Sequence, residues 1–148
     1  MPDVPYRLHP LFVHFPIAFY MTGVVLDLAL WAGLLPAIPA IDGNALAHGL
    51  LWAGVATTLP TVAAGLLDYA RLPSNVQDNR TLQRHILCMG SAFVLFLVAA
   101  VWRAKSGEFD AAPATPILLL EIAGALALIA GGHLAGRAVF EILPRELD

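Results

Sequence analysis

Four long apolar segments constrain this chain more than any other feature. They cover roughly residues 11–35, 45–70, 82–102 and 117–140, and short stretches rich in proline, glycine and polar residues separate them. Each segment has the roughly 20 residues that a helix needs to cross the hydrocarbon core of a bilayer. Short connections favour antiparallel neighbours. The pattern therefore predicts a single all-α domain over residues 1–148, a four-helix transmembrane bundle with up-down-up-down topology.

The composition agrees with a lipid environment and argues against several classes of function. Of the 148 residues, 59% are hydrophobic and only 13% are charged, whereas a soluble domain carries about 25% charged residues. The net charge of −3 gives no reason to expect nucleic acid as a partner. Cys88 is the only cysteine, which excludes an internal disulfide and a covalently attached haem. No nucleophile–base pair or phosphate-binding loop is visible, so there is little reason to expect an enzyme.

The basic residues predict how the chain is oriented. We call the side of the membrane that holds both chain termini side A, and the opposite side, side B. Under the predicted threading, six of the eight basic residues fall on side A and two on side B. The positive-inside rule therefore predicts that both termini are cytoplasmic. The six are Arg7, Arg71, Arg80, Arg84, Arg137 and Arg145, and the two are Arg103 and Lys105.

Four of the five histidines also fall on side A. His9 and His14 open the first helix, His85 opens the third, and His133 lies in the last turns of the fourth, while His48 is on side B. Ionisable side chains inside a membrane are uncommon and usually functional. The sequence therefore predicts a cofactor or metal site on side A.

The depth of two of these histidines favours haem. His14 lies 17 residues before Trp31, and His85 lies 17 residues before Trp102. Tryptophans mark the membrane interface, so both histidines are expected at the same depth, about 25 Å from side B at the rise of a helix. The first and third helices should lie diagonally across the bundle. We therefore predict that His14 and His85 are the two axial ligands of a non-covalent haem b.

Asp68, at a similar level on the second helix, is predicted to support a ligand histidine through its second ring nitrogen. His9 and His133 are alternative haem ligands. A second interpretation keeps the same side chains without haem, because imidazoles and a carboxylate also suit zinc, copper or iron. That transition-metal site would be built from His9, His14, His85 and His133 with Asp68.

A second polar group is predicted on side B. Asp27 lies four residues before Trp31, and Glu121 lies near the start of the fourth helix, so both carboxylates should sit about 6 Å inside the boundary. His48 and Arg103 are expected near the same face. Because lipid-facing charges are costly, both carboxylates should face the interior of the bundle. The group is either a proton or ion site or a static clamp between helices.

Several motifs, in order, resemble a known family. The opening octet HPLFVHFP, from His9 to Pro16, is similar to the opening signature of a family of bacterial predicted membrane proteins called domain of unknown function 2231. Weaker matches follow at Asp27, at Gly65 to Tyr69 (GLLDY), at His85, and at Gly131 and Gly132 with Leu134. The chain departs from the family pattern at Ala135 to Phe140, where a Gly-Val-rich tail is usual.

The resemblance implies four helices in a bacterial inner (plasma) membrane. It implies no established activity, but relatives fused to or encoded near redox modules favour an electron-transfer setting. We therefore expect a b-type haem module or redox-complex subunit that exchanges electrons with a quinone or a partner subunit. The alternatives are a transition-metal protein and an accessory subunit without a cofactor. Assembly with further copies of the chain stays open.

Overall fold

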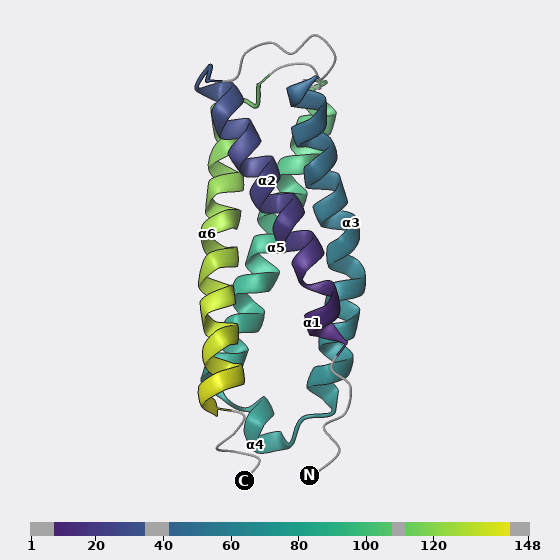
Figure 1. Ribbon diagram of the computed structural model, residues 1–148, viewed down its shortest axis with the longest axis vertical. Coiled ribbons are helices and arrows are strands. Elements are labelled where there is room, and N and C mark those ends of the chain that lie inside the picture. Colours follow the sequence, from purple (N-terminus) through teal and green to yellow (C-terminus); the bar gives the residue numbers. More distant parts are fainter. Residues whose placement is uncertain (1–7, 35–41, 108–111, 143–148) are drawn as a thin grey trace.

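The computed structural model describes residues 8–34, 42–107 and 112–142, and its regular elements are all helices (Figure 1). Four spans in these ranges are long and apolar enough to cross a membrane, so the predicted all-α membrane bundle is confirmed. The spans are His9–Trp31, Gly43–Ala70, Arg80–Ser106 and Thr115–Phe140. The elements are α1 (His9–Phe12), α2 (His14–Trp31), α3 (Gly43–Ala70), α4 (Ser74–Gln77), α5 (Arg80–Ser106), α6 (Thr115–Arg137) and the π-helix η1 (Ala138–Ile142).

Polar side chains cap the first turns of two helices and so explain where these helices begin. Asp42 Oδ1 accepts the backbone N–H groups of Asn44 and Ala45 and so begins α3. Asn79 Oδ1 accepts the N–H of Thr81 at 2.9 Å, which starts α5 two residues before the predicted range. Such caps satisfy donors that a first helical turn leaves without partners.

Gly107, with φ of 71°, ends α5 in the left-handed conformation that glycine adopts readily. The first membrane span ends with α2 at Trp31, whereas the sequence predicted that it would end at residue 35. That position lies outside the described residues, together with Arg7 and Arg145 of the orientation argument. The single-domain organisation of the whole chain stays a prediction.

The helices pack as two antiparallel pairs, α2 with α3 and α5 with α6. The pairs join through α3 with α5 and α2 with α6, so α2 and α5 lie across the core from each other. Figure 1 shows α2 tilted across the bundle, with α1 next to the lower part of α3. The ends of the helices define side A, near His9, Ala70 and Arg80, and side B, near Trp31 and Ser106.

Burial is concentrated in the half of the bundle nearer side B. On α5, every buried residue lies between Ala92 and Arg103, and none lies between Arg80 and Ser91. The core cluster consists of Tyr20, Val24, Leu51, Val55, Ala92, Phe96, Ala100, Ala125 and Leu128. The half of α5 nearer side A is therefore covered only partly by the rest of the described chain.

Candidate functional site

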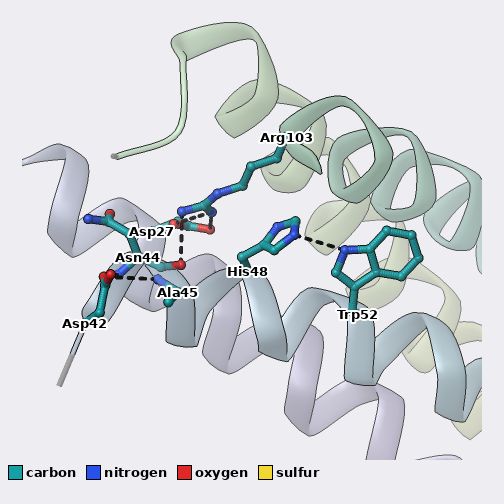
Figure 2. Close-up of polar contacts among 7 residues, drawn as sticks. All are labelled: Asp27, Asp42, Asn44, Ala45, His48, Trp52 and Arg103. Carbon is teal, nitrogen blue, oxygen red and sulfur yellow. Dashed lines mark hydrogen bonds and ion pairs between the residues drawn. The ribbon is translucent and has the colours of Figure 1, made fainter. Parts of the chain in front are cut away.

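An ion pair buried at side B joins α2 to α5 across the core. Arg103 Nη1 donates to both carboxylate oxygens of Asp27 at 2.8 Å, and both side chains are fully buried. Arg103 Nη2 also donates to the backbone oxygen of Asn44 at 3.2 Å. The sequence placed Arg103 at side B; there its side chain points into the bundle, where the Asp27 carboxylate compensates its charge (Figure 2).

Glu121, on α6, is the third ionisable residue of this cluster. Its side chain is fully buried, and it interacts electrostatically with Asp27 and Arg103. Neither carboxyl oxygen has a hydrogen-bond donor among the described residues. Both predicted carboxylates thus face the interior of the bundle, as the cost of a lipid-facing charge requires.

His48 lies at the edge of the same cluster, on α3. The indole N–H of Trp52 donates to His48 Nε2 at 3.0 Å (Figure 2). Since an indole nitrogen is only a donor, Nε2 must be the acceptor, and His48 is neutral with its proton on Nδ1. The structure therefore brings together the four residues that the sequence grouped at side B: Asp27, His48, Arg103 and Glu121.

An aromatic stack separates the two ends of the bundle. The rings of Tyr20 and Phe96 are 4.0 Å apart and nearly parallel. A Cβ added at Gly54 would lie 2.5 Å from the Tyr20 ring, and one added at Gly124 would lie 3.0 Å from Phe96. These glycines let the stack fill the middle of the core. The tyrosine hydroxyl pairs with Thr58 Oγ1 at 3.1 Å.

At side A, two histidines from helices that are far apart in the sequence lie next to each other. The rings of His9, on α1, and His85, on α5, have centroids 6.5 Å apart and planes at 80°. His9 Nδ1 lies 3.1 Å from the Thr61 carbonyl oxygen, and His85 Nδ1 lies 2.8 Å from that of Gly131. A carbonyl can only accept, so each Nδ1 carries a proton, and in the neutral form of each ring Nε2 is the nitrogen with the lone pair.

Asp68 supports His9 through the backbone and not through the ring. Its Oδ2 accepts the backbone N–H of His9 at 3.0 Å, which satisfies a donor at the start of α1. Gly65 makes room for the imidazole, since an added Cβ would lie 2.9 Å from His9 Nδ1. The segments HPLFVHFP and GLLDY of the sequence analysis therefore meet at His9.

The other side A histidines are arranged differently. His14 is exposed, and its Nδ1 donates at 3.1 Å to the carbonyl oxygen of Pro10, in α1, four residues earlier. His133 is exposed on α6. The ring beside His85 is thus that of His9, although equal depth had suggested His14. Depth along a helix does not specify which way a side chain points.

Metal-ligand residues do not form a larger group in the part of the chain that the structure describes. No three histidine, cysteine, aspartate or glutamate side chains there are arranged to hold a metal ion. The His9–His85 pair can supply two ligands, with both Nδ1 atoms held by backbone carbonyls. Metal-ligating histidines commonly have this second hydrogen bond, because it fixes the ring orientation.

Comparison with known proteins identifies the family. The chain matches, over residues 5–143, the model of a family described as predicted membrane protein (DUF2231). The chain belongs to this family. No curated protein and no solved structure matches it. Membership in DUF2231 agrees with the four apolar spans and establishes a membrane protein. The family description names no activity.

Proposed function

We propose that this membrane protein is a haem-binding electron-transfer module whose haem b is held between His9 and His85 at side A. The observation that carries the proposal is the pair of imidazoles 6.5 Å apart, each anchored through Nδ1 to a backbone carbonyl. Because each ring is held through Nδ1, its Nε2 atom is the one that could bind the iron. The rings are already fixed by these hydrogen bonds, so they would lose less rotamer freedom when haem binds.

The spacing of the rings would let both imidazoles reach one metal. Metal–nitrogen distances are about 2 Å, and the ring centroids are 6.5 Å apart. The rings meet at 80° in a T-shaped arrangement, so a group held between them would need both Nε2 atoms turned toward it.

Haem fits this pair better than a bare transition-metal ion does. A porphyrin supplies four nitrogens, so two histidines complete six-coordinate iron. A zinc or copper ion would need further protein ligands, and the described residues hold no group of three or more. The partial cover over α5 between Arg80 and Ser91 leaves surface that a large planar group would bury.

The position of the pair limits the route of the electrons. The iron would supply one-electron chemistry. One site near side A cannot carry electrons across a hydrocarbon core about 30 Å thick. The exchange therefore takes place at one face, with a quinone in the bilayer or with a redox subunit bound there.

We also propose that side A is cytoplasmic in a bacterial inner membrane. With Arg103 paired inside the bundle, the described basic residues near the membrane boundary are Arg71, Arg80, Arg84 and Arg137 at side A and Lys105 at side B. The positive-inside bias thus becomes stronger. A reporter fused after Asp148 should be active only in the cytoplasm, and periplasmic activity would contradict this orientation.

Absorption of the purified protein tests the cofactor directly. The protein, titrated with hemin in detergent, should bind one equivalent and give the spectrum of low-spin six-coordinate iron. His85→Ala should lose that spectrum, whereas His48→Ala, a matched change at side B, should keep it. Wild-type protein that takes up no hemin would contradict the proposal. Metal analysis then distinguishes the alternatives: bound zinc, copper or iron without haem selects the transition-metal protein, and no metal selects the accessory subunit.

A further inference from the structure

The side B cluster is independent of the proposed haem site and has an unbalanced charge. Asp27, Arg103 and Glu121 are all fully buried. The Asp27 carboxylate uses both oxygens to bind Arg103 Nη1 at 2.8 Å, and this pair is neutral as a whole. An ionised Glu121 would therefore add one uncompensated negative charge in the core of an apolar bundle.

The surroundings of Glu121 favour its neutral form. No donor from the described residues reaches either of its oxygens, and its carboxyl group interacts with that of Asp27. Two carboxyl groups can share a hydrogen bond only if one of them carries a proton. Because Arg103 stabilises Asp27 as the anion, the proton belongs on Glu121, which can then donate to Asp27.

We propose that Glu121 is an exchangeable proton-binding site, with its proton directed at the Asp27–Arg103 ion pair. The ligand of this site is a proton and not a metal cation. The charged and titratable groups that face it come from the two helices packed against α6: Asp27 from α2 and Arg103 from α5. His48, on α3, interacts with Arg103.

The position of the cluster allows exchange with water at side B. Asp27 lies four residues before Trp31, an exposed tryptophan at the end of α2, which is about 6 Å along the helix axis. The Tyr20–Phe96 stack closes the core on the other side. The proposed exchange is therefore with water at side B, where His48 is buried beside Arg103.

Infrared spectroscopy of the whole protein in lipid nanodiscs tests this proposal. The carbonyl stretch of a protonated carboxylic acid should be present at neutral pH, shift in D₂O, and disappear as the pH is raised. Glu121→Gln keeps the shape of the neutral acid and should fold, but it should lack this band. Asp78→Asn, at an exposed acidic residue between α4 and α5, is the matched control and should keep the band.

The alternatives give different results. A wild-type band that neither shifts in D₂O nor titrates would mean a static clamp, and no band at neutral pH would mean that Glu121 is ionised. Loss of the band when choline chloride is replaced by sodium chloride would identify a cation site. A band that persists in Glu121→Gln would belong to another residue. Each of these four results would overturn the proposal, and the wild-type measurements decide it even if the variant fails to fold.

Discussion

Asp27 and Arg103 at side B are both fully buried and joined at 2.8 Å, whereas Asp68 and Arg71 at side A are 17% and 53% exposed and lie 4.0 Å apart. The first pair is enclosed by packed helices. The second lies at the edge of a partly covered half of the bundle, where the rings of His9 and His85 lie next to each other. The contrast suggests that the side B half supplies stability and the side A half supplies binding surface.

Removing the cation of the buried pair should give the largest loss of stability. Arg103→Met leaves Asp27 and Glu121 together without a compensating charge. Breaking a buried ion pair in this way costs about 3–5 kcal/mol. Asp27→Asn should cost less, because Glu121 can lose its proton and pair with Arg103 in its place.

The free energy of unfolding in mixed micelles measures both changes. Exposed ion pairs contribute about 0–1 kcal/mol. If Arg103→Met lowered the free energy of unfolding by less than about 1 kcal/mol, the buried pair at side B would be no more stabilising than the exposed pair at side A. Equal losses in Arg103→Met and Asp27→Asn would contradict the replacement of Asp27 by Glu121.

Filling the space beside the aromatic stack should give the next largest effect. In Gly54→Ala the new Cβ would lie 2.5 Å from the Tyr20 ring, so the ring or the helix must move. Overpacking a well-packed core costs about 1–3 kcal/mol. Gly49→Ala is the control, since nothing lies within 4 Å of its added Cβ, and it should be neutral or slightly stabilising. Thermal unfolding that ranks the two variants in the opposite order would contradict the packing described here.

Much of the fold could be predicted from the sequence, because membrane spans depend on length and apolar composition, which are local properties. The grouping of Asp27 with Arg103 and Glu121 was also accessible, since depth and the cost of buried charge both pointed to it. The pairing of His9 with His85 was not. Both His9 and His14 open the first span, and only the docking of His9 onto Gly65 and Asp68 of α3 separates them.

The role of Asp68 in holding His9 predicts a moderate effect. Asp68→Ala removes the acceptor of the His9 backbone N–H and should destabilise the protein by about 1 kcal/mol, as the loss of a helix cap does. Haem affinity should fall as well, because the start of α1 loosens. Hemin titration would separate the two effects, and unchanged affinity would mean that Asp68 does not position His9.

The smallest effect is expected at Arg71. Arg71→Ala breaks a pair with Asp68 at 4.0 Å in which the arginine is 53% exposed. Exposed pairs contribute about 0–1 kcal/mol, and haem uptake should be unchanged, since Asp68 still binds the His9 backbone. If Arg71→Ala lowered the free energy of unfolding as much as Arg103→Met, the ion pairs at side A and side B would not differ in their contribution to stability.

The comparison of His9→Ala with His14→Ala tests the central claim most directly. The two positions are five residues apart at the start of the first span, and only the His9 ring lies beside His85. In hemin titrations of both purified variants, His9→Ala should lose the low-spin spectrum and His14→Ala should bind haem like the wild type. Loss of the spectrum in His14→Ala with retention in His9→Ala would contradict the assignment of His9 and His85 as the ligand pair.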